Sequence, residues 1–506
     1  MAYVIGLDIG TTSTIGLLIK PGDASIRFTA SRPVRFYSEQ PSWAEEDPTE
    51  WWENVCQICS ELIEVSGISN NDVVGIGVTG MLPAVVLMDS ENKLIRRSIQ
   101  QSDGRCSAQV SALKSEVNEE EFLRKSGNGI NQQLVAAKLR WLEQNEPDNF
   151  SQIATVMGSY DYINWKLTNE KSVDRNWALE AGFVDVGLGQ LSSELIAHAH
   201  ISESAVPSLS QSHKILGKLT QLAAEQTGLS EGTPVVGGSA DHIASAYGAG
   251  IHQAGDVLLK FGGSVDVLIS SKTASPDERM YLDYHLLPDL FMPNGCMASG
   301  GSGLNWFVNQ FAKYEAQQAQ DKGVTPHRYL DSLSQSVPAG SEGVVALPYL
   351  LGEKTPIHDP FARGVFAGLS LNHGVPHLWR ALLESFAYAI RHHLEVFQDM
   401  GFSTQRFWVS DGGSNSEFWM QIVSDVLQQP LQTLEGHPGS CLGAAWMAAV
   451  GSGLSSDFTA VSDYVSYFRV IEPNPENQRV YQQGYDTYQS MYRQLQPIFS
   501  KENSDD

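Results

Sequence analysis

The hydrophobic pattern of the first hundred residues is typical of short strands separated by polar turns. Apolar runs rich in β-branched residues occur in YVIGLDI, TIGLLIK, VVGIGVTG and AVVLMD. An amphipathic segment from Pro48 to about Val65 lies between them and predicts a helix, with Thr49 and Glu50 near its start as helix N-termini favour. Longer helical patterns follow in LVAAKLRWLEQN and DYINWKLTN. Strands that alternate with helices predict an α/β fold with a mixed sheet.

The pattern restarts near residue 234. TPVVGGSADHIASAYGAG predicts a strand, a glycine turn and a helix, and GDVLLKFGGSVDVLISS then repeats the opening order of strand, glycine turn and strand. The similarity of LLKFGGSVDVLI to VIGLDIGTTSTIGLLI predicts an internal duplication, with one hairpin from each half facing a shared cleft. The glycine-rich segment 246–254 marks the boundary. We therefore predict two domains, at residues 1–248 and 249–506.

Length and charge narrow the class of protein. A chain of 506 residues is too long for a single core, which supports two domains. Its formal net charge of −25 argues against nucleic acid and anionic membranes as partners. The N-terminus has no basic segment before its apolar run, and no stretch approaches the ~18 apolar residues of a membrane span, so we expect a cytoplasmic protein. Cys56 and Cys59 form a CxxC inside the predicted helix, which favours a buried helix face over a metal site.

The first hairpin, GLDIGTTSTIG at residues 6–16, is a candidate phosphate site. A tight glycine turn directs backbone N–H groups and hydroxyls at an anion. Asp8 is a candidate Mg²⁺ ligand, because Mg²⁺ is held by one or two carboxylates together with phosphate oxygens. The same residues also fit a simple hydrogen-bonded turn. GIGVTG at residues 75–80 is followed by Pro83 and a second strand pattern, which argues against a dinucleotide site.

Asp241 is the second candidate acid. It follows a GGS turn at the start of a predicted helix, where the positive helix end favours a carboxylate. The local pattern fits a general base, and it also fits an ordinary first-turn residue of a helix capped by Ser239. Adjacent helical positions point in different directions, so the pattern argues against a dyad of Asp241 and His242.

Two glycine-rich turns in the second half of the chain predict a site for a planar ligand. ASGGSGLNWF precedes a predicted helix from Asn305 to Lys313, and VSDGGSNSEFWMQIVSDVL repeats the arrangement. Each glycine lets a ligand approach the backbone closely. The aromatic residues Trp306, Phe418 and Trp419 are expected in the core.

Taken together, these stretches resemble the FGGY carbohydrate kinases of the actin-like ATPase superfamily. The most specific match is GVFAGLSLNHGVPHLWRALLE at residues 364–384, which has the spacing of the second family signature. KLRWLEQN at residues 138–145 and PSWAEEDPTEWW match earlier family segments. The resemblance covers roughly residues 3–452. It implies two ribonuclease H-like domains with mixed sheets flanked by helices and a cleft between them, with ATP, Mg²⁺ and a small sugar as ligands.

The resemblance also implies roles for individual residues. The two hairpins would grip the phosphates of ATP from opposite sides, with Asp8 holding Mg²⁺ and Asp241 acting as the catalytic base. Gly263 stands where the family usually has threonine. The implied ATP-binding residues are Gly10, Thr11, Thr12, Ser13, Gly262, Gly263, Ser264, Gly301, Asn305, Gly412, Gly413 and Asn415.

The chain departs from xylulokinases in the segments that shape the sugar pocket. Met81, Leu82, Pro83 and Ala84 replace the usual Gln-Met-His-Gly, and Gln101 replaces the tryptophan of a Trp-x-Asp-x-Arg motif. We expect Asp103 to bond sugar hydroxyls, with Arg105 orienting it. The predicted substrate-binding residues are Met81, Leu82, Pro83, Gln101, Asp103, Arg105 and Asp241.

The substrate that the resemblance implies is a pentulose such as xylulose, or a related ketose or polyol. The alternative interpretation is a sugar and nucleotide sensor of the same fold with little turnover. Dimers are common in the family, and the sequence leaves the oligomeric state open.

Overall fold

The structure of the protein is a computed structural model that describes residues 2–436 and 438–501. The chain forms two compact units. Unit 1 comprises residues 1–252, 272–292 and 438–465, and unit 2 comprises residues 253–271, 293–437 and 466–506. The chain first passes from unit 1 to unit 2 after His252, close to the boundary predicted at residue 248, and it then returns twice to unit 1. Two segments of the second half of the sequence therefore belong to the first unit.

Unit 1 is built on a mixed sheet with the strand order β13-β14-β5-β1-β2-β3, and β15 also pairs with β5. The predicted strands are present: β1 is antiparallel to β2 and parallel to β5. The strands are β1 (Tyr3–Ile9), β2 (Ser13–Lys20), β3 (Ser25–Pro33), β5 (Val73–Gly80), β13 (Ile215–Lys218), β14 (Pro234–Val236) and β15 (Ser239–Ala240).

The smaller strands of unit 1 pair outside this sheet. The segment predicted from AVVLMD gives β6, which pairs with β8. These strands are β4 (Glu45–Glu46), β6 (Val86–Met88), β7 (Ser98–Ile99), β8 (Thr155–Met157), β9 (Val173–Asp174), β10 (Val184–Asp185), β11 (Gln190–Leu191), β12 (Leu209–Ser210) and β18 (Tyr281–Tyr284).

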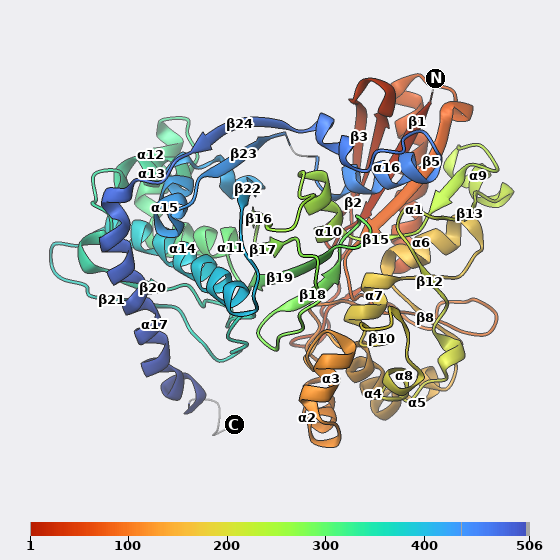
Figure 1. The fold of residues 1–506 in the computed structure, drawn as a ribbon, viewed down its shortest axis with the longest axis horizontal. Coiled ribbons are helices and arrows are strands. Elements are labelled where there is room, and N and C mark those ends of the chain that lie inside the picture. The colour runs from red at the N-terminus through yellow and green to blue at the C-terminus, as the bar shows by residue number, and fades with distance from the viewer. Residues whose placement is uncertain (1, 437, 502–506) are drawn as a thin grey trace. The chain divides into compact units, whose positions relative to one another are not determined.

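Helices flank the sheet of unit 1, as Figure 1 shows for α16 beside β1 and β5. The predicted helix at Pro48 is α1, which packs on β2 and β3 and includes both residues of the CxxC. Burial raises the pKa of Cys59, so this thiol is a packing residue. The helices are α1 (Pro48–Ser66), α2 (Ser107–Glu116), α3 (Glu119–Ser126), α4 (Val135–Asn145), α5 (Pro147–Phe150), α6 (Ser159–Thr168), α7 (Arg175–Glu180), α8 (Ser193–Ala197), α9 (Gln221–Thr227), α10 (Asp241–Gly248) and α16 (Ser440–Gly451).

Glycines in the sheet allow α16 to pack unusually close to it. A Cβ atom on Gly6 would lie 2.0 Å from the carbonyl oxygen of Cys441, and one on Gly77 would lie 2.1 Å from that of Ala444. Any side chain at these two positions would push the helix away. The start of α16 is thereby held against β1.

Unit 2 repeats this architecture in a sheet whose strand order includes the run β19-β17-β16-β22-β23-β24. The predicted second hairpin is β16 and β17, which are antiparallel, and β16 is parallel to β22. The strands are β16 (Asp256–Phe261), β17 (Val265–Ile269), β19 (Phe291–Met297), β20 (Val345–Leu347), β21 (Val365–Ala367), β22 (Arg406–Ser410), β23 (Leu431–Glu435) and β24 (Ser466–Ile471).

Long helices cover this second sheet. The helix α14 is buried along much of its length and packs against α13 and α15 (Figure 1). The helices are α11 (Gly301–Phe311), α12 (Lys313–Asp321), α13 (Pro326–Ser334), α14 (Val375–Asp399), α15 (Glu417–Leu427) and α17 (Gln478–Lys501). Within the described residues, none of the helices combines the length and apolar character that a membrane crossing requires.

Candidate functional site

The two candidate acids of unit 1 lie at the same edge of its sheet. Asp8 is opposite Thr79 in the parallel pair of β1 and β5, and Thr79 is opposite Ser239 in the pair of β5 and β15. Because neighbouring strands are ~4.8 Å apart, Asp8 and Ser239 are separated by about 10 Å. Asp241 follows two residues later as the first residue of α10. The sheet therefore brings both acids to the same edge, with β5 between the strand that carries Asp8 and the strand that precedes Asp241.

The predicted phosphate hairpin is a tight turn between β1 and β2. The Gly10 amide donates to the carbonyl of Ser13 at 3.1 Å and closes the turn. A Cβ atom on Gly10 would lie 3.0 Å from that same oxygen, so a side chain fits poorly there. The Thr12 side chain is exposed at the tip. The turn is hydrogen-bonded, which fits a simple structural turn. It also presents threonine at its surface, which fits a phosphate site.

Asp8 is linked to a residue that sequence reasoning missed. Its side chain is 9% exposed, and its Oδ2 accepts a 2.8 Å hydrogen bond from the hydroxyl of Ser440. Ser440 is the first residue of α16. The positive end of that helix therefore lies beside the carboxylate. Ser440 has no local sequence signal, because it follows Asp8 by 432 positions.

The structure corrects the sequence interpretation of Asp241 and His242. The residue that caps α10 is Ala240, and Ser239 lies in β15. The side chain of Asp241 accepts the backbone N–H of His242, and its Oδ1 lies 3.3 Å from His242 Nδ1. The two neighbours do contact each other, because the first turn of a helix leaves backbone N–H groups that a side chain can fold back to meet.

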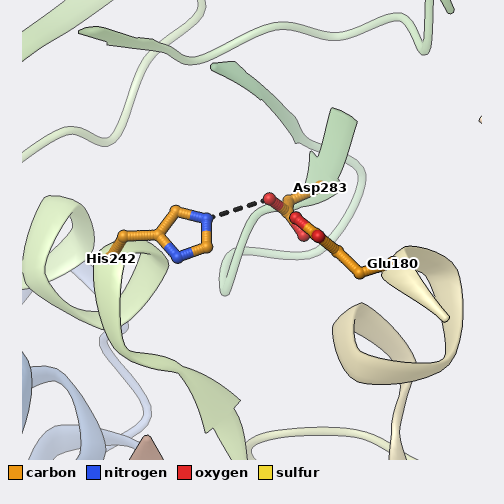
Figure 2. A group of neighbouring side chains, drawn as sticks. All are labelled: Glu180, His242 and Asp283. Atoms are coloured by element: carbon orange, nitrogen blue, oxygen red, sulfur yellow. Dashed lines mark hydrogen bonds and ion pairs between the residues drawn. The ribbon is translucent and has the colours of Figure 1, made fainter. Parts of the chain in front are cut away.

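His242 connects Asp241 to a second buried acid, Asp283 of β18. The ring Nε2 of His242 lies 2.9 Å from Oδ2 of Asp283, as the dashed line in Figure 2 marks. Burial opposes a charge on His242, but its hydrogen bonds with Asp241 and Asp283 outweigh this cost and raise the pKa of His242 to about 10. His242 is therefore an imidazolium at neutral pH.

A third acid, Glu180 at the end of α7, completes this cluster (Figure 2). Ligand atoms of Glu180, His242 and Asp283 lie within 4.8 Å of one another. Because Nε2 of His242 is already used by Asp283, the arrangement is that of an ion-pair network. No sequence signal pointed to Glu180 or Asp283, since they are far from Asp241 in the chain.

Three of the predicted sugar-binding residues, Met81, Leu82 and Pro83, follow β5 and are buried. The Met81 amide donates to the Ile9 carbonyl at 3.1 Å, which places this segment directly beyond the sheet edge. Met81 is 2% exposed and Leu82 is 7% exposed, and a cis peptide bond joins Leu82 to Pro83.

Asp103 is held by hydrogen bonds to neighbouring residues. It is 0% exposed, and its two oxygens accept hydrogen bonds from the Ala44 amide and from the amide and side chain of Arg105. This geometry makes Asp103 a support for Arg105, and its contact with a sugar stays a prediction. Gln101 Oε1 and Arg105 Nη1 are instead buried without a hydrogen-bond partner among the described residues. Such atoms are costly unless a ligand or water satisfies them.

In unit 2, most of the predicted nucleotide residues line one cavity of about 960 Å³. The Gly301 amide donates to the Gly262 carbonyl at 2.9 Å, which joins the second hairpin to the start of α11. Ser264 does not line the cavity. The predicted residues that line it are Gly262, Gly263, Gly301, Asn305, Gly412, Gly413 and Asn415.

The cavity has a second wall that the sequence did not reveal. His327, Arg328 and Asp331 of α13 contribute to it. Burial raises the pKa of Asp331, whose carboxyl accepts from Trp379 Nε1 at 2.8 Å and from the Ser416 hydroxyl at 2.6 Å. These two partners lie 48 and 85 positions from Asp331 in the chain, so no motif marks them.

The aromatic residues of this region divide into three cases. Trp419 is buried and lies edge-on to Phe261, with ring centroids 4.9 Å apart. Phe418 is half-buried and lines the cavity. Trp306 is 37% exposed, so its expected core position is wrong. The helix predicted from Asn305 begins earlier, at Gly301, and its buried residues are Gly303, Leu304, Phe307 and Val308.

Comparisons with known proteins agree with this geometry. Residues 3–248 match the N-terminal domain of the FGGY family of carbohydrate kinases, and residues 258–452 match its C-terminal domain. The crystal structure of xylulose kinase from Rhodospirillum rubrum is 52% identical, covers 98% of this chain and 100% of its own, and superposes with a TM-score of 0.92. The xylulose kinase of Escherichia coli (strain K12) is 28% identical over 98% of this chain and 100% of its own.

A more distant solved structure shares the fold. The glycerol kinase of Plasmodium falciparum, crystallised with ADP, is 18% identical, covers 97% of this chain and 98% of its own, and has a TM-score of 0.86. The two-unit α/β architecture is thus that of sugar kinases.

Proposed function

Because this chain belongs to the FGGY family of carbohydrate kinases, we propose that it transfers the γ-phosphoryl group of ATP to a hydroxyl of a pentulose such as xylulose. The observation that carries this proposal is the position of Asp241 at the N-terminus of α10, at the same sheet edge as Asp8. The 52% identity to a xylulose kinase favours a pentulose among the sugars that this family phosphorylates.

Asp241 acts as the general base in this proposal. Its side chain is 37% exposed, so a sugar hydroxyl can reach it. The carboxylate accepts the proton of the attacking hydroxyl while the oxygen attacks the γ-phosphorus and the bond to ADP breaks. The reaction requires alignment and charge neutralisation more than covalent help, which suits a site made of backbone donors and carboxylates.

The donor set beside the first hairpin fits Mg²⁺. Mg²⁺ favours one or two carboxylates completed by phosphate oxygens and water, and Asp8 supplies a carboxylate held by Ser440 at the sheet edge. When bound, Mg²⁺ would neutralise charge on the phosphates. Ser440 orients the Asp8 carboxylate, and the turn from Gly10 to Ser13 offers backbone and hydroxyl donors to the phosphates.

The cavity of unit 2 is the proposed nucleotide site. Its glycines allow the adenine and ribose to approach the backbone, and Asn305 and Asn415 offer amide groups to their polar edges. Phe418 at its wall provides an apolar surface for the base. Gln101 and Arg105 of unit 1 carry the buried unpartnered atoms that a sugar would satisfy.

The test is a coupled ADP-release assay with D-xylulose, other ketoses, polyols and aldonates. We expect one sugar to stimulate ADP release, and Asp241→Asn to lower kcat on the order of 10³-fold, in the range that a general base supplies. Asp89→Asn is the matched control, because Asp89 caps a turn through its Oδ1 and asparagine keeps that acceptor.

Two results would contradict the proposal. Full turnover by Asp241→Asn would remove Asp241 from the base role. Thermal stabilisation by a sugar without ADP release from any sugar in the panel would show a binding protein in place of a kinase. Binding of ADP, followed by calorimetry, verifies that each variant is folded.

A further inference from the structure

The strand β18 delivers a buried carboxylate to the proposed catalytic base. β18 belongs to residues 272–292, a segment of the second half of the sequence that packs in unit 1. Its Asp283 is 0% exposed and lies 2.9 Å from His242 Nε2 (Figure 2). His242 is in turn within 3.3 Å of Asp241. Three side chains from two distant segments therefore form a continuous line that ends at Asp241.

The position of Asp283 is fixed independently of His242. The side-chain amide of Asn128 bonds to both backbone groups of Leu282, donating at 3.0 Å and accepting at 2.8 Å. The side-chain amide of Asn176 bonds to both backbone groups of Tyr284 in the same way, at 2.9 Å and 2.7 Å. Each asparagine imitates the pairing of a neighbouring strand. The residues on either side of Asp283 are thereby held in place.

A further contact anchors the end of this segment. Arg175 donates a hydrogen bond to the His285 carbonyl, and its guanidinium lies 4.6 Å from the centre of the Tyr284 ring. Asn128, Arg175 and Asn176 all belong to unit 1. A group can orient a catalytic side chain only if it is itself held in place. The anchored β18 meets this requirement for Asp283.

Only the doubly protonated form of His242 carries an N–H on both ring nitrogens. In that form Nε2 donates to Asp283 while Nδ1 donates toward Oδ1 of Asp241. The carboxyl groups that face the ring come from three elements: Asp241 from α10, Asp283 from β18 and Glu180 from α7. The negative charge on each of these carboxylates favours a positive charge on the His242 ring.

We propose that Asp283 is a positioning residue that acts through the His242 imidazolium to hold the Asp241 carboxylate in the orientation in which it accepts the sugar proton. This inference rests on the proposed role of Asp241 as the base. His242 does not accept the sugar proton in this arrangement, because both of its ring nitrogens already carry a proton and Asp241 is the acceptor. Its charge and its two hydrogen bonds fix the direction of the base.

The test begins with Asp283→Asn, which keeps the shape of the side chain and removes its charge. We expect kcat to fall about tenfold, the size of effect seen when an orienting carboxylate of a histidine is lost. The KM values for ATP and sugar should stay within about twofold, since neither ligand is bound by Asp283. An unchanged kcat would overturn the inference.

A pH profile of kcat supplies a readout that a purely structural role would not move. The wild type should lose activity on the alkaline side as His242 deprotonates, with a midpoint near its pKa of about 10. In Asp283→Asn this limb should move to lower pH by about one unit or more, because one of the carboxylates that favour the imidazolium is gone. An alkaline limb in the same place as the wild type would contradict the inference.

The second variant is His242→Asn, whose amide keeps a neutral donor near Asp241. We expect a similar fall in kcat. If Asp283 acts through His242, Asp283→Asn has no further effect on kcat in the His242→Asn background. If the two residues have independent roles, the double variant would show the product of the two single losses in kcat, as multiplying losses. Multiplying losses would therefore overturn the inference.

The matched control is Glu143→Gln. Glu143 pairs with His200 at 2.6 Å on the surface, so this variant removes the same kind of interaction away from α10. It should leave kcat and the pH profile unchanged.

The outcomes also separate the two proposals. Activity in Asp241→Asn would refute the base itself, whereas an inactive Asp241→Asn beside a normal Asp283→Asn would refute only the positioning role.

Discussion

Ser440 donates a 2.8 Å hydrogen bond to Oδ2 of Asp8, although 432 positions separate the two residues in the sequence. The contact places the start of α16 beside the carboxylate that is the proposed Mg²⁺ ligand. The glycines at positions 6 and 77 make this close approach possible. The geometry of Asp8 therefore depends on a helix near the C-terminal end of the chain.

Ser440→Ala should increase the Mg²⁺ concentration needed for half-maximal activity by about tenfold. The reason is that Asp8 loses the partner that orients it, and such partners typically contribute 10- to 100-fold to metal affinity or activity. A titration of ADP release against Mg²⁺ at saturating ATP measures the change. Ser452→Ala is the control, because Ser452 follows the opposite end of the same helix. An unchanged Mg²⁺ requirement would argue against Ser440 as the residue that orients Asp8.

Gly413→Ala should weaken ADP binding by about tenfold. A Cβ atom there would lie 2.7 Å from Trp419 Cζ3 and 2.8 Å from Phe261 Cβ, and both residues line the cavity. Overpacking of this kind costs about 1–3 kcal/mol or displaces the neighbouring rings. Calorimetry with ADP measures the loss. At Gly412 a Cβ would meet nothing within 4 Å, so Gly412→Ala should have a clearly smaller effect. Equal effects would show that contacts at the cavity wall do not decide affinity.

Arg105→Lys should lower the free energy of unfolding by on the order of 3 kcal/mol. The Arg105 guanidinium bonds to Asp103 at 2.8 and 2.7 Å and to Glu45 at 2.7 Å, and it lies 3.9 Å from the centre of the Trp43 ring. A lysine ammonium cannot reproduce the paired bonds or the stacking.

Denaturant unfolding measures this loss, and the KM for sugar should rise while the KM for ATP stays constant. Arg27→Lys is the control, because the exposed Arg27 pairs with Asp23 at the surface. If both variants were equally stable, the buried network around Arg105 would contribute nothing.

Glu46→Gln should make the stability of the protein less sensitive to pH. Burial raises the pKa of Glu46 to about 8, although Trp51 Nε1 donates to its carboxyl at 2.9 Å. The folded chain thus keeps this proton up to about pH 8, whereas the unfolded chain releases it near its ordinary pKa. The unfolded state binds fewer protons in this window, so the free energy of unfolding contributed by Glu46 falls as pH rises through it.

Thermal unfolding at pH 5 and pH 8 measures this effect. The decrease in Tm between the two pH values should be smaller in Glu46→Gln than in the wild type, because glutamine keeps an acceptor for Trp51 and cannot ionise. Glu64→Gln, at an exposed position of the same helix α1, is the control. An identical pH dependence in wild type and Glu46→Gln would show that Glu46 is not protonated in the folded state.

Much of the fold could be predicted because its signals are local. The hairpin of β1 and β2 follows from an apolar run, a glycine turn and a second apolar run, and the hairpin of β16 and β17 repeats it. The start of α1 at Pro48 follows from helix-start residues that lie side by side in the chain. Such signals act over a few residues, so a single sequence carries them.

Predictions about side-chain surroundings were less successful. His242 was not expected to contact Asp241, yet the two are hydrogen-bonded, because the side chain of Asp241 folds back onto the first turn of α10. The burial of Asp103 against Arg105 and the Ala44 amide likewise could not be read from the sequence. In each case the rotation of a side chain decides the contact, and the spacing of residues along the chain does not specify that rotation.

The sequence by itself determined the strands, the two hairpins, the duplicated plan and the family, because each depends on residues that are close in the chain or on a recognisable signature. Only the tertiary structure decided which residues surround the candidate acids. Ser440 reaches Asp8, and Asp283 reaches His242, because segments 438–465 and 272–292 return to the first unit. Contacts of this kind depend on packing between distant segments, for which the linear order of residues contains no direct signal.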